Sequence, residues 1–458
     1  MSIQTARGIA LCAVLTLAAC GGGGGGVSLP AGTPTAGAIA TDIPVPNWVA
    51  GQAASSDLGV VSNLSPGLFF FTDRNNKAVE VIDIASMRVI ATIGGFTGCR
   101  TATGADLGVG CQGAVTGVSG PNGVTLVPGG TGGHGRLYVG DVARIFVIDI
   151  GTLSVTAIIP GVGAVGGSTT RADEGCYLST YNLVAYSNNA DVPPVTTLVS
   201  TITNTVVGKI IYNDTAGKPA ASVEQCRYDP VTDQLFVNND GTTANPDGEI
   251  DAIPGAAIVA LVAAGGSINI TAMAGVKIFP LGTCAPTGLA LGPGNDIATG
   301  CRPSANGASL DVKIFDRTKG NPVLTANTNL PGALLATVNA GGGDQLEYDQ
   351  TANRYYNASS RWNPTGKVQT GSGGACTAAQ PCTPRLFIID AATRTVVSSL
   401  PTGNNAHGLA VDPVTGRVFL PYSSATNPVG ATLDPSFLGT GTTAQGTVNG
   451  GISVINGR

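Results

Sequence analysis

Three side chains of this sequence have the chemistry to act together at a site. Glu174, Glu224 and His407 each come directly before a short apolar stretch, in the segments EGCYLS, EQCRYD and HGLAVD. Carboxylates and an imidazole suit several divalent metal ions, and the same groups can act as general acids and bases. The three residues are far apart in the chain, so any joint role depends on the elements that position them.

Those elements belong to a repeat. Seven segments each consist of two short apolar runs joined by a tight turn, which predicts a β-hairpin. They lie at residues 58–73, 122–141, 174–189, 223–240, 286–301, 344–359 and 407–422. A second hairpin, such as AVEVIDIASMRVIATIGG or RLFIIDAATRTVVSSLPTG, follows most of them. The repeat recurs at intervals of about 50 to 65 residues. Four strands per repeat at this spacing are typical of β-propeller blades.

The segment FIIDAATRTVVSSLPTGNNAHGLAVDPVTGRVFLPYS (387–423) resembles the YVTN family of β-propellers. The repeat of that family couples a VID-type strand to a GVAV-type strand and a YVTN-like strand. The resemblance is weaker around 160–215 and 260–285, and it carries no functional residues with it. We expect an all-β, seven-bladed propeller with blades of four antiparallel strands.

The two ends of the chain are expected to share one blade. The C-terminal GISVI matches a third strand, which leaves the outer position of the last blade to another segment. AIATDIPVP (38–46) resembles the outer strands VIATIGG and VVSSLPTG. We predict that this N-terminal strand joins the last blade and closes the ring, which also protects strand edges from aggregation.

Aligning the hairpins on their first strands places one residue of each blade at the upper mouth of the central channel. These residues are Leu58, Asn122, Glu174, Glu224, Thr287, Gln345 and His407. Six of the seven can form hydrogen bonds or bind an ion. The long segments 95–121, 241–255, 357–384 and 423–450 connect strands on the same face, which favours a binding surface there. His134, the only other histidine, falls on the lower face.

Two interpretations of this mouth stay open. In one, Glu174, Glu224 and His407 hold a divalent ion, calcium or magnesium, in a metal-dependent hydrolase or lyase. Propellers that resemble gluconolactonases and streptogramin lyases hold a metal there, although this chain lacks the full ligand set of either family. In the other, the protein is a non-enzymatic binding or scaffold module for a protein, glycan or small molecule. The sequence has no GxSxG elbow, P-loop or haem-type CxxCH motif, which favours the second interpretation.

The N-terminus has the features of a lipoprotein signal. Arg7 precedes an apolar stretch, 8–17, that is too short to span a bilayer as a helix. LAAC (17–20) resembles the lipobox of bacterial lipoproteins, which implies a signal peptide at 1–19 and a lipid on Cys20. The resemblance also implies a place in the cell envelope, at the outer membrane or facing the periplasm.

The composition indicates the domain organisation and the expected partners of the chain. Residues 20–36 are expected to form a flexible glycine-rich tether, and 37–458 a single propeller domain. Charged residues make up 11% of the chain against about 25% in ordinary domains, without a basic run, so nucleic acid is not an expected partner. We expect a monomer that meets the membrane through its lipid. The apolar run AAIVALVAA (256–264) is predicted to be a buried strand.

The cysteines predict disulfides. Of ten, Cys12 leaves with the signal and Cys20 carries the lipid, so eight remain in an oxidising compartment. The expected pairs are Cys99–Cys111, Cys376–Cys382, Cys284–Cys301 and Cys176–Cys226.

Overall fold

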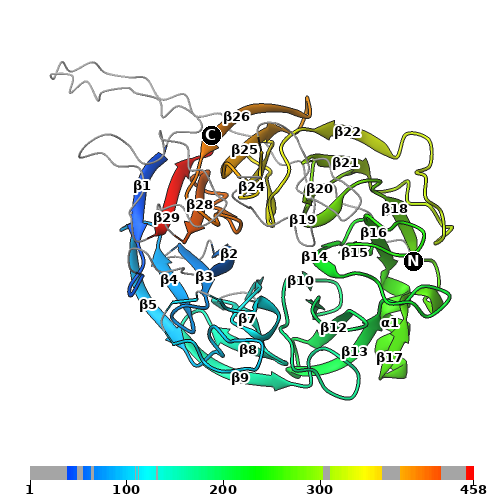
Figure 1. Ribbon diagram of the computed structural model, residues 1–458, viewed down its shortest axis with the longest axis horizontal. Coiled ribbons are helices and arrows are strands. Elements are labelled where there is room, and N and C mark those ends of the chain that lie inside the picture. The colour runs from blue at the N-terminus through cyan, green and yellow to red at the C-terminus, as the bar shows by residue number, and fades with distance from the viewer. Residues whose placement is uncertain are drawn as a thin grey trace, which may run out of the picture. The chain divides into compact units, whose positions relative to one another are not determined.

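Seven sheets, each built on four antiparallel strands, form a ring in the computed structural model of the protein (Figure 1). The structure describes residues 39–48, 55–62, 67–108, 110–111, 113–129, 133–302, 310–363, 382–423 and 450–458. This architecture confirms the predicted all-β, seven-bladed propeller. Each sheet is one blade, and its strands are given below from the innermost to the outermost.

The first three blades follow the chain without interruption. Blade 1 contains β2 (Ser56–Ser62), β3 (Leu68–Asp73), β4 (Ala78–Asp83) and β5 (Arg88–Gly94). The 3-10 turn η1 (Thr116–Val118) follows it. Blade 2 contains β6 (Val124–Val127), β7 (Arg136–Asp141), β8 (Arg144–Asp149) and β9 (Ser154–Pro160). Blade 3 contains β10 (Gly175–Leu178), β11 (Leu183–Asn188), β12 (Val195–Ser200) and β13 (Thr205–Ile211).

The other four blades complete the ring. Blade 4 contains β14 (Val223–Asp229), β15 (Gln234–Asn239), β16 (Glu249–Pro254) and β18 (Lys277–Pro280). Blade 5 contains β19 (Ala285–Leu291), β20 (Asp296–Arg302), β21 (Val312–Asp316) and β22 (Leu334–Val338). Blade 6 contains β23 (Leu346–Asp349), β24 (Arg354–Ser359), β25 (Arg385–Asp390) and β26 (Thr395–Pro401). Blade 7 contains β27 (Ala410–Val411), β28 (Arg417–Tyr422), β29 (Gly451–Asn456) and β1 (Ile39–Pro44).

The ring is closed as predicted. β1 pairs antiparallel with β29 and takes the outer position of blade 7. The inner strands contact one another in chain order, and β27 of blade 7 contacts β2 of blade 1. The segment after β1 reaches Trp48, whose ring packs edge-on against Phe71 of blade 1 at 6.1 Å between centroids. The N-terminal strand therefore ties the last blade to the first.

The core lies between the blades. Within the described residues, seven clusters of buried apolar side chains form, one at each contact between neighbouring blades. The middle strands are buried on both faces and are accordingly almost continuously apolar, as in β3 with the sequence LFFFTD. The outer β5 instead alternates between exposed and partly buried residues.

The apolar run 256–264 is a helix, α1 (Gly255–Ala264), so the prediction of a buried strand is wrong. Alanine is the strongest helix former, and it dominates this run. Ile258 and Leu261, three residues apart, are buried on one side of the helix. Among the described residues, no helix is long and apolar enough to cross a bilayer.

Helix α1 begins an insertion between the third and fourth strands of blade 4. It continues into β17 (Ser267–Asn269) and the 3-10 turn η2 (Ile270–Ala272). β17 leaves its own blade and pairs in parallel with β13 of blade 3. A second long connection, 317–333, follows the third strand of blade 5. Short lower turns were expected at both places, so these two connections differ from the prediction. The segment 241–255 was expected to be a long upper loop, but it contains a strand, β16, and leaves a shorter loop.

Three of the four predicted disulfides are present in the described part of the chain: Cys99–Cys111, Cys176–Cys226 and Cys284–Cys301. Cys376, the expected partner of Cys382, lies outside the described residues. Disulfides of this number indicate an oxidising compartment.

Candidate functional site

Strand register identifies the residues that share one level at the upper mouth of the channel. In each blade, one inner-strand residue lies opposite the fourth residue of the second strand, as Gly59 does with Phe71 and Gly175 with Tyr186. Two residues earlier, the blades carry Asp57, Asn122, Asp173, Glu224, Thr287, Asp344 and His407. We name these seven residues the mouth ring. All are polar, and all but the half-buried Asp344 are buried.

The mouth ring differs from the predicted alignment in three blades. Asp57, Asp173 and Asp344 take the positions predicted for Leu58, Glu174 and Gln345. Asn122, Glu224, Thr287 and His407 stand at the predicted level. An alignment on apolar residues does not fix the register to a single residue, and in blade 1 a bulge between Ser56 and Gly59 adds to the difference. The correction raises the number of carboxylates at this level from two to four.

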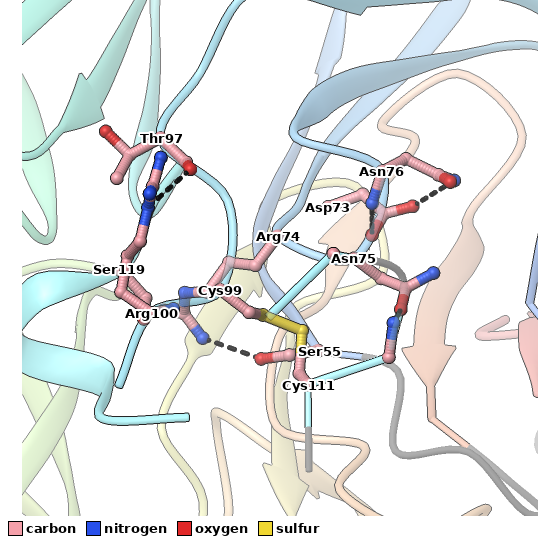
Figure 2. Close-up of a disulfide and its surroundings, with 12 residues drawn as sticks. Ser55, Asp73, Arg74, Asn75, Asn76, Thr97, Cys99, Arg100, Cys111 and Ser119 are labelled. Atoms are coloured by element: carbon pink, nitrogen blue, oxygen red, sulfur yellow. Dashed lines mark hydrogen bonds between the residues drawn. A yellow bond between two sulfur atoms is a disulfide. The ribbon is translucent and has the colours of Figure 1, made fainter. Parts of the chain in front are cut away.

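Arginines from the upper connections neutralise these carboxylates. Arg74, which follows β3, is ion-paired with Asp57. It also donates to Asn122 Oδ1 at 2.6 Å and to Ser55 Oγ at 2.9 Å; Figure 2 shows the contact with Ser55. Arg171, which precedes β10, is ion-paired with Asp173, and its Nη1 lies 3.7 Å from Asp57 Oδ2.

The same pattern continues around the ring. Arg302, at the end of β20, lies 3.0 Å from Glu224 Oε1 and is ion-paired with Asp240. Arg361 Nη1 lies 2.9 Å from Asp344 Oδ1. Arg74, Arg171 and Arg361 pair with a carboxylate of their own blade, whereas Arg302 of blade 5 reaches Glu224 of blade 4. Sequence reasoning missed the arginines because only the inner strands were aligned, and the arginines lie at the ends of second strands or in connections.

His407 is part of this network. Its Nε2 lies 3.6 Å from Asp57 Oδ1, and its Nδ1 lies 2.7 Å from the carbonyl oxygen of Asn405. A carbonyl oxygen only accepts, so Nδ1 carries a proton. A carboxylate also only accepts, so the second nitrogen faces a partner that favours the imidazolium form.

Burial and charge shift the pKa values of the mouth ring in opposite directions. For Asp57, burial raises the pKa, but the charge of Arg74 and the other cations outweigh it and hold the pKa below its usual range. Burial raises the pKa of Asp173 to about 7. For His407, burial lowers the pKa, but the hydrogen bond to Asp57 and the charge of Asp344 outweigh it and leave the pKa raised. Within the ring, Asp173 therefore titrates near neutral pH.

Glu174 lies one level below the mouth ring, and among the described residues no arginine pairs with it. Its counterparts Gln225 and Gln345 accept hydrogen bonds from the backbone N–H groups of Leu289 and Leu409 at 2.5 and 2.7 Å. Glu174 is 4% exposed, and its Oε2 is buried without a hydrogen-bond partner among the described residues. Burial, followed by the neighbouring carboxylates, raises the pKa of Glu174 well above its usual range. It is a buried acid that keeps its proton.

Side chains cross the channel below the mouth ring. Gln345 Nε2 donates to the carbonyl oxygen of Gly59 at 3.2 Å, which joins blades 6 and 1. Arg227 Nη2 lies 2.6 Å from Glu347 Oε1, which joins blades 4 and 6. Neither pair belongs to neighbouring blades, so the mouth ring lies above a floor of side chains.

The predicted metal ligands are not assembled into one group. Within the described part of the chain, no three or more histidine, cysteine, aspartate or glutamate side chains are placed to hold a metal ion. Glu224 faces an arginine, His407 faces Asp57, and Glu174 lies one level lower. His134 is exposed in the lower turn between β6 and β7.

A disulfide-bonded loop borders the ring on the side of blade 1. Figure 2 shows the Cys99–Cys111 disulfide beside Arg74. The backbone N–H of Gly110 in this loop donates to Asn75 Oδ1 at 2.6 Å. The loop between β5 and β6 is thus fixed next to an arginine of the mouth, as a binding surface requires.

No protein-family model and no curated protein matches this chain. Among solved structures, a chain of the hydrazine synthase of Kuenenia stuttgartiensis is similar at 12% identity and a TM-score of 0.48, over 78% of this chain and 89% of that one. A chain of a mitotic checkpoint complex is similar at 12% identity and a TM-score of 0.49, over 90% and 96%. The U3-55K structure is similar at 11% identity and a TM-score of 0.48, over 89% and 96%. Similarity this distant carries no argument about function.

Proposed function

We propose that the protein is a lipid-anchored, extracytoplasmic binding module that engages a protein, glycan or small molecule with its upper face and channel mouth. The mouth ring is the observation that supports this proposal most. Seven equivalent positions are all polar, and arginines hold four carboxylates among them in fixed places. Preorganised polar groups of this kind favour specific recognition over non-specific adhesion.

Glu174, one level below the mouth ring, is a buried acid with unused hydrogen-bonding capacity. The carboxylates of the mouth ring are paired with arginines, whereas Glu174 Oε2 has no partner among the described residues. As a protonated acid it can donate to one ligand atom and accept from another. The metal-dependent alternative has no comparable support, because the carboxylates that it needs face arginines.

The binding proposal is tested with the domain at residues 37–458, screened against glycan and peptide arrays. The affinity of the strongest binder is then measured for Glu174→Gln, a change that copies the glutamine of blades 4 and 6 and should fold. We expect binding at least tenfold weaker, while His134→Ala on the lower face binds as the parent does. A binder that tolerates both Glu174→Gln and Arg361→Ala would contradict a role for the mouth.

The anchoring proposal rests on the LAAC motif and on the oxidising compartment that the disulfides indicate. Cys20→Ser should abolish metabolic labelling with a fatty-acid analogue and release the protein from membranes. A variant that stays in the membrane fraction without label would show that the anchor is elsewhere.

A further inference from the structure

The outer part of blade 4 contains a pocket of about 250 Å³ that shares no residue with the mouth ring. Its walls come from five separate segments: the connection after β13, residues between 239 and 244, strand β16, residues between 270 and 278, and residues 324 and 325. The last segment reaches blade 4 because Asn321 pairs with Ile278 of β18 as an isolated bridge. The two long connections that depart from the repeat therefore build this pocket.

Three carboxyl groups line the pocket, and two of them, Glu249 and Asp251, are buried. Glu249 and Asp251 alternate along β16, so they share one face of the strand, and they are 3% and 2% exposed. Asn239 Nδ2 donates to Asp251 Oδ2 at 3.0 Å, and Asn245 Nδ2 donates to Glu249 Oε2 at 2.5 Å. Among the described residues that line the pocket, none is a lysine, arginine or histidine. Asn213 lines it too, and its Oδ1 is buried without a partner.

Blade 1 contains a buried acid pair, Asp73 and Glu80, that can be compared with the pair in blade 4. Glu80 lies opposite Phe71 as Asp251 lies opposite Val237, and Asp73 takes the position of Asn239. The chain supplies three donors in blade 1: Trp48 Nε1 to Asp73 at 2.9 Å, Asn76 Nδ2 to both acids, and Thr92 Oγ1 to Glu80 at 2.6 Å.

In blade 4, Thr242 Oγ1 adds a long contact to Glu249 Oε2 at 3.4 Å, and the residues that line the pocket include no counterpart of Trp48. The position of Thr92 is taken by Ile278, which lies opposite Asp251 and has no side-chain donor. The space in front of the pair is the pocket instead of an indole ring. Its other walls are largely apolar and include Ile270, Val276 and Leu324.

We propose that this pocket binds a small organic amine, whose protonated nitrogen donates to Glu249 and Asp251 and whose apolar body packs against Ile270, Val276 and Ile278. The ligand supplies from outside what Trp48 supplies in blade 1: N–H donors carried by an apolar body. A positive charge suits the pocket because a cation is the one group that allows two adjacent buried carboxyls to ionise together. The proposal is independent of the function assigned to the mouth.

The charges around the pair give the pH dependence. Burial, followed by the charge of Asp251, raises the pKa of Glu249 well above its usual range, and burial raises the pKa of Asp251 to about 6. Tyr212 and Asp214 are the other titratable groups that line the pocket. The residues opposite the pair on β15 and β18 are uncharged: Asn239, Val237, Pro280 and Ile278. Amine binding should therefore strengthen as the pH rises through about 6.

The test is calorimetric titration of the protein with benzylammonium, and with benzyl alcohol and indole as neutral probes of similar size. We expect benzylammonium to bind at least tenfold more tightly than either neutral probe. Asp251→Asn should weaken benzylammonium binding at least tenfold, and Asp390→Asn, which removes an equal charge from a turn of blade 6, should not. Ile270→Trp fills the pocket without changing charge and should also abolish binding.

Three results would overturn the proposal: no binding of benzylammonium to the parent, equal or tighter binding of a neutral probe, or retention of benzylammonium binding by folded Ile270→Trp. The last variant keeps the proposal testable if Asp251→Asn does not fold.

Discussion

Blades 1 and 4 carry buried acid pairs that share one position of the repeat, Glu80 and Asp251, and satisfy them differently. In blade 1, Trp48, Asn76 and Thr92 donate to Asp73 and Glu80, so the pair is sealed by the chain. In blade 4, Glu249 and Asp251 receive amide donors on one side and face a pocket on the other. The repeat thus supplies the same framework twice, and the local insertions decide which pair is structural and which is open to a ligand.

The mouth ring is a third arrangement of buried acids. There, arginines neutralise the carboxylates directly, and the network spans several blades. Charge pairs of this kind fix the positions of the blades relative to one another, and removing one partner leaves the other buried and unpaired.

The largest effect should come from Trp48, which seals the blade 1 pair. Trp48→Ala removes a buried aromatic side chain and the donor to Asp73, and we expect a loss of about 3–5 kcal/mol in the free energy of unfolding. Leu324→Ala, on the half-buried wall of the blade 4 pocket, should cost about 1 kcal/mol or less. Urea unfolding measures both. Similar losses would mean that the two pairs are equally sealed.

The next largest effect should be a difference between the two acid pairs in how the free energy of unfolding depends on pH. Burial, followed by the charge of Glu80, raises the pKa of Asp73 to about 8, and burial raises that of Asp251 to about 6. A raised pKa means that stability is full below the unfolded value and declines as the pH rises to the folded value. Asp73→Asn should therefore flatten the decline between about pH 4 and 8, and Asp251→Asn only between about pH 4 and 6. Unfolding curves at pH 4, 6 and 8 would show this, and identical profiles would contradict it.

The smallest effect should come from His407 in the mouth ring. The raised pKa of His407 means that its stabilising contribution is full below about pH 6.5 and is lost as the pH rises through the folded value. His407→Gln should lower stability by about 1 kcal/mol at pH 5.5 and by less at pH 8. His134→Gln, on the exposed lower turn, should change neither value. A His407→Gln loss that does not depend on pH would show that the imidazole is neutral in the ring.

The fold was predictable because the same hairpin pattern occurs seven times in the sequence. Each copy has the same apolar periodicity and the same turns, and even the closing strand, β1, resembles the outer strands that it imitates. The run 256–264 broke the pattern, since its apolar residues fit a buried strand as well as a helix. Its alanines and the flanking Pro254 and Gly265 were the available signal.

The site was predictable only in part. Asn122, Glu224, Thr287 and His407 lie at the predicted level, while Glu174 and Gln345 lie one level down. The arginines of the mouth lie at the ends of second strands and in connections, outside the inner strands that were aligned. The blade 4 pocket needs five segments to meet in space, and none of them was predicted to form a site.

The central claim is that the blade 4 acid pair is open and the blade 1 pair is sealed, and carboxyl labelling tests it most directly. The folded protein would be treated at pH 6 with a water-soluble carbodiimide and glycine ethyl ester, and each acid followed by peptide mass spectrometry. We predict modification at Glu249 and Asp251, with Asp73 and Glu80 protected. Equal modification of both pairs, or modification of Asp73 and Glu80 first, would contradict the account.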